Sequence, residues 1–188
     1  PHGVKEGKIH AFYNFGEDPL QTEPDSADMK ETLQNCDFVI SQDIFMTQTT
    51  AYADVVFPGT SWGEHDGVFS ASDRTFQRFT AAVPPKGECK HDWQIFSELS
   101  TRMGYPMHYE NTKEIWDEVR ENCPSFYGAT YEKMEGVGHA QWPIPTLECP
   151  GTPTLFKGGK FNKPDGKARL LAADFVVPTE LPDDEYPL

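Results

Sequence analysis

The first sixty residues alternate between short apolar runs and polar stretches with helical periodicity. The apolar runs cover residues 9–15, 38–41 and 54–57, and each ends at a glycine, a polar pair or a proline–glycine pair. Residues 25–36 begin with an Asp-Ser pair that can cap a helix, and apolar residues then recur at helical spacing. A short helix or turn over residues 47–53 leads to the third run. The pattern predicts strand, helix, strand, short helix, strand.

Near-continuous apolar strands joined by helices are typical of a parallel sheet that is covered on both faces. We therefore predict an α/β fold over residues 1–105: a three-layer, Rossmann-like parallel sheet with helices on both faces. Ligands of such sheets bind outside the carboxyl ends of the strands. In this chain those ends are residues 16–18, 42–43 and 58–61.

The rest of the chain predicts an appendage to this domain. An alternating stretch predicts a β-hairpin that turns at Ser72–Arg74, and two helices follow, one capped by Asp92 and one over residues 112–122. Prolines and glycines then multiply, which favours irregular chain with a hairpin at residues 163–166. We expect residues 106–188 to form a helical and then irregular extension.

Charge and composition exclude several classes of partner. The 188 residues carry 30 acidic and 16 basic side chains, a net charge of −14. A protein that follows a nucleic-acid backbone needs basic surfaces, so we expect no nucleic-acid partner. No apolar run approaches the roughly 20 residues that span a bilayer, and the first residues do not resemble an export signal. Four widely spaced cysteines favour a cytoplasmic protein.

The cysteines and histidines show no pattern of a metal site. The cysteines form no C-x-x-C pair, and the six histidines are scattered. No second histidine stands one helical turn from His65, as a zinc-binding helix would require. The phosphate-binding motif G-x-x-x-x-G-K does not occur. The residues alone therefore show no metal-ligand cluster.

The predicted ligand edge of the sheet is acidic. Asp18 follows the first strand in Gly16-Glu17-Asp18-Pro19, and Asp43 ends the second strand. Carboxylates repel phosphate but accept hydrogen bonds from amino groups and ribose hydroxyls. These positions therefore suit a purine or a sugar better than a pyrophosphate. Taken singly, each residue is also compatible with an ordinary turn.

Two other interpretations remain open on the residues alone. The first is an acidic protein-interaction domain without a small ligand, which would place Asp18, Gln42 and Asp92 apart on the surface. The second is a nucleotide-sugar hydrolase that uses Glu64 and Asp66 as paired carboxylates. Carboxylates two residues apart do not readily face one substrate bond, which disfavours the hydrolase.

Several segments resemble the cofactor-binding portion of the molybdopterin oxidoreductases, the formate dehydrogenases among them in particular. They are "GEDPLQT", "QDIFMTQTTAYADVVFPGTSWGEHDGVFSASDRTFQR" and "DWQIFSELSTRMGYPMHY", and the resemblance continues to "DEYPL". It implies a molybdenum or tungsten centre held by two molybdopterin guanine dinucleotides, a 4Fe-4S cluster, and oxidation of formate to carbon dioxide. It also implies a Rossmann-like domain for each dinucleotide, and possible electron-transfer or hydrogenase subunits as partners.

The resemblance also implies residues for cofactor contact. They lie at or near the predicted carboxyl ends of the strands, with one more at the start of the following helix. At Gly59 a backbone contact is expected, because a glycine lets a ligand approach closely. The assigned positions are Gly16, Glu17, Asp18, Thr22, Gln42, Asp43, Gly59 and Asp92.

The resemblance does not extend to the redox centre of the family. The cluster-binding cysteines and the metal-ligating cysteine or selenocysteine of the family lie upstream of the matching region, and a carboxyl-terminal domain lies downstream. We therefore expect this chain to be a piece of a formate dehydrogenase that binds one dinucleotide together with the remaining domains. By itself it should contain no cluster and should not oxidise formate.

Overall fold

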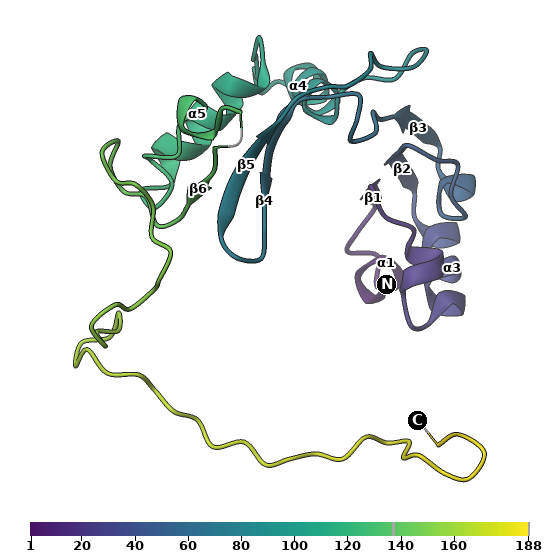
Figure 1. Ribbon diagram of the computed structural model, residues 1–188. Coiled ribbons are helices and arrows are strands. Elements are labelled where there is room, and N and C mark those ends of the chain that lie inside the picture. The colour runs from purple at the N-terminus through teal and green to yellow at the C-terminus, as the bar shows by residue number, and fades with distance from the viewer. Residues whose placement is uncertain (137, 188) are drawn as a thin grey trace. The chain divides into compact units, whose positions relative to one another are not determined.

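The computed structural model describes residues 1–136 and 138–187 (Figure 1). Contacts divide the chain into two units, Pro1–Thr152 and Pro153–Leu188. All helices and strands of the described residues lie in the first unit. The domain boundary that we expect after residue 105 stays a prediction.

A three-stranded parallel sheet forms the first part of the larger unit. Its strands are β1 (Ala11–Phe15), β2 (Phe38–Asp43) and β3 (Val55–Pro58), in the order β1-β2-β3. Both pairings are parallel. The three strands lie at the predicted places along the chain, and the predicted parallel α/β fold is confirmed.

Short helices cover one face of this sheet. They are α1 (His2–Lys5), α2 (Pro19–Thr22), α3 (Ser26–Asn35) and the 3-10 turn η1 (Thr50–Tyr52). Asp25 caps α3 by accepting a hydrogen bond from the Asp28 amide at 2.9 Å. The apolar stripe of α3 packs against the central strand, so that Met29, Leu33 and Val39 form a buried cluster.

The helix α4 (Asp92–Arg102) packs against the opposite face, which completes the three layers. The Phe96 ring lies 5.7 Å from the Tyr13 ring and 5.1 Å from the Phe15 ring, between centroids. The predicted cap of α4 was wrong by one residue. His91 occupies the capping position and Asp92 is the first helical residue, which directs the Asp92 side chain to other partners.

A second, antiparallel sheet follows. It contains β4 (Gly67–Ser70), β5 (Thr75–Phe79) and β6 (Ala140–Gln141), in that order. The predicted hairpin is confirmed as β4–β5. Arg74 has a φ of 72° at its turn and donates to the Thr152 carbonyl at 3.0 Å.

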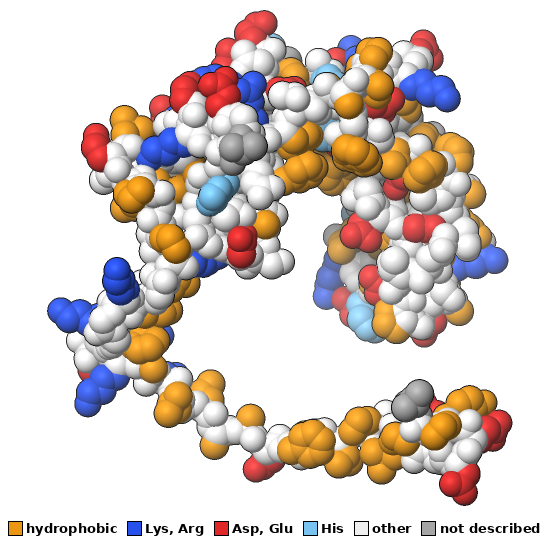
Figure 2. Space-filling view, viewed as in Figure 1, with side chains coloured by type: hydrophobic (Ala, Val, Ile, Leu, Met, Phe, Trp, Pro, Cys, Tyr) orange, Lys and Arg blue, Asp and Glu red, His pale blue; other side chains and the backbone are white. Residues whose placement is uncertain are grey.

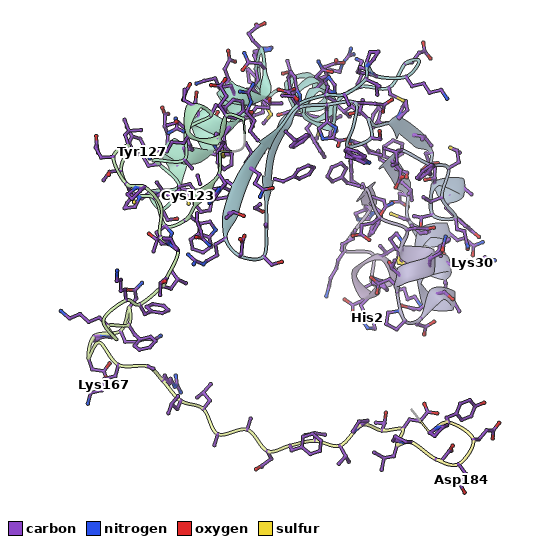
Figure 3. The ribbon with its side chains drawn as sticks, in the orientation of Figure 1. His2, Lys30, Cys123, Tyr127, Lys167 and Asp184 are labelled. Atoms are coloured by element: carbon purple, nitrogen blue, oxygen red, sulfur yellow. The ribbon has the colours of Figure 1, made fainter. Side chains whose placement is uncertain are left out.

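The helix α5 (Thr112–Asn122) and the 3-10 turn η2 (Glu132–Met134) pack with this second sheet. The helix α5 has the bounds that the sequence predicts, and Cys123 follows it, before the turn that contains Tyr127 (Figure 3). The extension from residue 106 is therefore more ordered than we expected, since residues up to 152 close a second core. The buried members of that core are Phe76, Ala129, Tyr131, Met134, Ala140 and Ile144.

Within residues 153–187 the structure contains no helix or strand. The predicted hairpin is reduced to a turn, in which the Gly166 amide donates to the Lys163 carbonyl at 2.9 Å. Apolar side chains stand along this extended segment, where Leu170 is 92% and Phe175 86% exposed (Figure 2). None of the helices in the described residues has the length and apolar character that a bilayer span requires.

Candidate functional site

The carboxyl ends of β1, β2 and β3 meet at one edge of the parallel sheet, which we call the carboxyl edge. The Gly16 amide donates to the Gln42 carbonyl at 2.9 Å, and the Gly59 amide donates to the Asp43 carbonyl at 3.2 Å. Gly16 has a φ of 60°, a conformation that glycine adopts without a Cβ penalty. The structure thus brings together four of the predicted site positions.

The Asp18 side chain accepts hydrogen bonds from α2 and from the segment before η1. Its Oδ1 accepts from the Thr49 amide at 3.0 Å and the Thr49 hydroxyl at 2.6 Å, while Oδ2 accepts from Gln21 Nε2 at 2.6 Å and the Gln48 amide at 3.3 Å. A carboxylate has about four acceptor positions, so these donors fill its capacity. Desolvation raises the pKa of Asp18, but the hydrogen bonds outweigh it and lower the pKa below its ordinary value. Cofactor contact by Asp18 stays a prediction.

Glu17 and Thr22 are exposed on either side of Asp18. The Glu17 carbonyl accepts from Asn14 Nδ2 at 2.5 Å, which fixes the turn and leaves the carboxylate in solvent. The Thr22 hydroxyl donates to the Asp18 carbonyl at 3.3 Å. Their assignment to the cofactor also stays a prediction.

Gln42 joins the sheet to α4. Its side chain is 1% exposed, and its Nε2 donates to Asp92 Oδ1 at 2.7 Å. Its Oε1 accepts a hydrogen bond from the Tyr13 hydroxyl. Desolvation and then the negative charge of Asp92 raise the pKa of Tyr13, so this hydroxyl keeps its proton. An interaction domain would place Gln42 and Asp92 apart on the surface. In the structure the two side chains are instead bonded to each other.

Gly59 lies directly against Asp92. A Cβ at residue 59 would stand 2.8 Å from Asp92 Oδ1, so only glycine leaves room for the carboxylate in this position. Asp92 Oδ2 has no hydrogen-bond partner among the residues that the structure describes, and the side chain is partly exposed. Asp43 follows Gln42 at the end of β2, and its Oδ1 accepts a hydrogen bond from the Phe45 amide at 2.9 Å. The carboxyl edge therefore presents carboxylate oxygens.

Three apolar side chains that our sequence analysis did not assign follow β2 directly. Ile44 is 50%, Phe45 71% and Met46 76% exposed. A contiguous group of exposed apolar residues beside polar groups marks a binding surface more often than a single exposed apolar residue does. The sequence contains a usable signal, since an apolar triplet after the polar end of a strand has no place in the sheet core.

The carboxylates of the hydrolase interpretation stabilise loops. Glu64 accepts from the Ser61 amide at 2.8 Å and the Lys86 amide at 3.1 Å, and the Ser61 bond is the main cause of its lowered pKa. Asp66 accepts from the Thr112 hydroxyl at 2.7 Å. A carboxylic acid with a lowered pKa is a poor proton donor, and the two groups bind different segments. The geometry does not support a paired acid and base.

A cleft with a volume of about 460 Å³ runs along α4, past Trp93, Ser97 and Thr101 to residues 107–110. None of the predicted site residues lines it. Within the described residues, no group of three or more histidine, cysteine, aspartate or glutamate side chains is placed to hold a metal ion. The carboxyl edge remains the candidate site, because the polar groups converge there.

Comparison with protein families decides the identity of the fold. The model of the family described as molybdopterin oxidoreductase matches residues 1–102, which contain the parallel sheet and α4. The chain belongs to the molybdopterin oxidoreductase family. A solved structure of this family's fold, acetylene hydratase from Pelobacter acetylenicus, superimposes with a TM-score of 0.66 over 88% of this chain and 22% of that chain, at 24% identity.

Curated members of the family match the whole chain. Formate dehydrogenase H from Escherichia coli is 54% identical over 190 residues, which cover 100% of this chain and 26% of that protein. The F420-dependent formate dehydrogenase 1 subunit alpha from Methanococcus maripaludis is 38% identical over 96% of this chain and 27% of that protein. The chain thus spans about a quarter of the length of these relatives, and the resemblance seen in the sequence is confirmed.

Proposed function

We propose that the chain is part of a molybdenum or tungsten formate dehydrogenase, and that its carboxyl edge binds the guanosine portion of one molybdopterin guanine dinucleotide. The relatives named as formate dehydrogenases support the first statement. One observation carries the second: the Asp92 carboxylate is held at the carboxyl edge, beside Gly59, by the buried side chain of Gln42.

The groups at this edge fit a guanosine chemically. Guanine presents imino and amino donors and ribose presents hydroxyls, which carboxylates accept. Asp43 and Asp92 supply such acceptors, and the exposed side chains of Phe45 and Met46 supply apolar surface for a ring.

The same edge does not fit a diphosphate. Carboxylates repel phosphate, and the cation nearest in sequence to Asp92, Lys90, is bound to Glu98 at 2.7 Å. We therefore assign the diphosphate to cationic groups outside these residues. Of the eight predicted residues, our proposal keeps six in contact with the cofactor: Gly16, Glu17, Thr22, Asp43, Gly59 and Asp92. For Asp18 and Gln42, whose predicted contact is untested, the bonds within the protein favour a role in holding the site in shape instead.

The bound cofactor would supply the metal centre at which formate loses two electrons, with release of carbon dioxide and a proton. A 4Fe-4S cluster in the remaining domains would pass the electrons on. Relatives named as alpha subunits favour further subunits as electron acceptors. No residue of this chain is assigned to the transfer of electrons or protons, because the resemblance to the family implies that its redox ligands lie in the remaining part of the protein.

The test uses the complete enzyme from a host that makes the cofactor. Asp92→Ala should lower the guanine nucleotide and metal retained per polypeptide, because one acceptor is lost. Asp37→Ala is the matched control, since Asp37 precedes β2 at the opposite end and, among the described residues, bonds only His10, at 2.8 Å. Full nucleotide content in Asp92→Ala, with unchanged thermal unfolding, would overturn the assignment of the site.

A further inference from the structure

We propose that Tyr13 is a positioning residue for this site: its hydroxyl fixes the Gln42 amide so that the Asp92 carboxylate stays at the carboxyl edge. This inference rests on the proposed function and extends it to a residue of strand β1. Tyr13 is far from Asp92 in sequence and has no motif of its own. Its role follows from the order of donors and acceptors in a series of three side chains, Tyr13, Gln42 and Asp92, of which the central one is buried.

The series has a fixed direction. Asp92 can only accept, so the Gln42 group that faces it must be the Nε2 donor, as observed at 2.7 Å. The Gln42 Oε1 then faces Tyr13 and needs a donor, which the Tyr13 hydroxyl supplies. The reverse amide orientation would place Oε1 against the Asp92 carboxylate, two acceptors in contact. Asp92 therefore selects the amide orientation, and the Tyr13 hydroxyl stabilises it by supplying the donor that Oε1 requires.

Burial makes this selection effective. Gln42 is 1% exposed, so water cannot readily replace a lost partner. The Tyr13 ring is itself held in place, stacked on Phe96 of α4 at 5.7 Å between centroids. The raised pKa of Tyr13 keeps the hydroxyl protonated and therefore able to donate. Strand β1, strand β2 and helix α4 each supply one member of the series.

Gly59 restricts Asp92 further. It leaves the carboxylate just enough room, since a Cβ at residue 59 would lie 2.8 Å from Oδ1. Oδ1 is bound to Gln42, and Oδ2 has no hydrogen-bond partner among the described residues. The series thus leaves one carboxylate oxygen available to a ligand in a defined position.

Tyr13→Phe tests this without removing the ring. In the ligand-free chain, NMR should show slow solvent exchange of the Gln42 Nε2 protons in the wild type and at least tenfold faster exchange in Tyr13→Phe. Tyr52→Phe is the matched control, because Tyr52 is a partly buried tyrosine on the other face of the sheet whose hydroxyl has no hydrogen bond among the described residues. Unchanged Gln42 exchange in Tyr13→Phe would overturn the inference.

A second measurement uses the complete, cofactor-loaded enzyme. Tyr13→Phe should retain roughly threefold to tenfold less guanine nucleotide per polypeptide, the size expected for the loss of one hydrogen bond. Normal retention in Tyr13→Phe together with low retention in Asp92→Ala would overturn the role of Tyr13 and leave the site in place. Normal retention in both variants would overturn the site itself and, with it, the role of Tyr13.

Discussion

Replacement of Asp18 by alanine removes the acceptor that joins the turn after β1 to the segment before η1. The Thr49 amide and hydroxyl lose their partner, and Thr49 is 0% exposed. A buried donor without an acceptor costs about 1–3 kcal/mol. The bonds from Gln21 and Gln48 lie on exposed residues, where water replaces the lost acceptor. Because the two Thr49 terms are not additive, we expect a loss of about 2–4 kcal/mol of unfolding free energy.

The charge of Asp18 makes this contribution pH-dependent. Desolvation raises its pKa, but the bonds from Thr49 and its neighbours lower the pKa below the ordinary value of 3.8. A group with a lowered folded pKa contributes stability that is complete above the unfolded pKa and is lost as pH falls through the folded pKa. The stability difference between the wild type and Asp18→Asn should therefore be constant above about pH 5 and decrease below it.

Urea unfolding followed by circular dichroism measures the loss of unfolding free energy in Asp18→Ala. Hydrogen exchange at the Thr49 amide measures the local loss of its acceptor. Asp25→Ala is the control: Asp25 is an exposed aspartate that caps α3 with one hydrogen bond, and its loss should cost about 1 kcal/mol. The reasoning is refuted if Asp18→Ala costs no more than Asp25→Ala. At about pH 2.5, roughly one unit below the unfolded pKa, the difference in unfolding free energy between the wild type and Asp18→Asn should have decreased. A difference that persists unchanged to that pH would refute the pH argument.

Three further predictions concern other parts of the molecule. Gly59→Ala should displace the Asp92 carboxylate, because the new Cβ would meet Oδ1 at 2.8 Å; an NMR spectrum with unshifted Gln42 side-chain signals would contradict this. Met134→Ala should cost about 2–5 kcal/mol in urea unfolding, because Met134 is 1% exposed in the second core; a loss below about 1 kcal/mol would show that the segment does not close that core. The 188-residue chain should hold no stoichiometric iron and reduce no dye with formate; either signal above a blank would contradict our assignment of the redox centre to other residues.

The sequence is sufficient to predict the elements that depend on local patterns. The apolar runs around β1, β2 and β3 predict the parallel sheet, and the Asp25 cap predicts the start of α3. Each of these signals lies within a few consecutive residues. The β4–β5 hairpin is predicted for the same reason, since its alternation and turn are contiguous.

Features that depend on distant segments were not predicted. The pairing of Phe76 with Ala140 closes the second sheet across more than sixty residues, and β6 is too short to have a pattern of its own. Two partners of Asp18, Gln48 and Thr49, lie 30 and 31 residues away, so the sequence could not distinguish a structural carboxylate from a ligand contact. The order of Tyr13, Gln42 and Asp92 likewise depends on the packing of α4 on the sheet.

The central claim is that the carboxyl edge of the parallel sheet binds the guanosine portion of the cofactor. The most direct test is an NMR titration of the 188-residue chain with GDP as the probe. Our account predicts saturable shifts of the Gly16, Phe45 and Gly59 amides that are weakened in Asp92→Ala, with no shifts in α5. No saturable shift up to millimolar GDP, or shifts confined to the cleft along the outer side of α4, would contradict the claim.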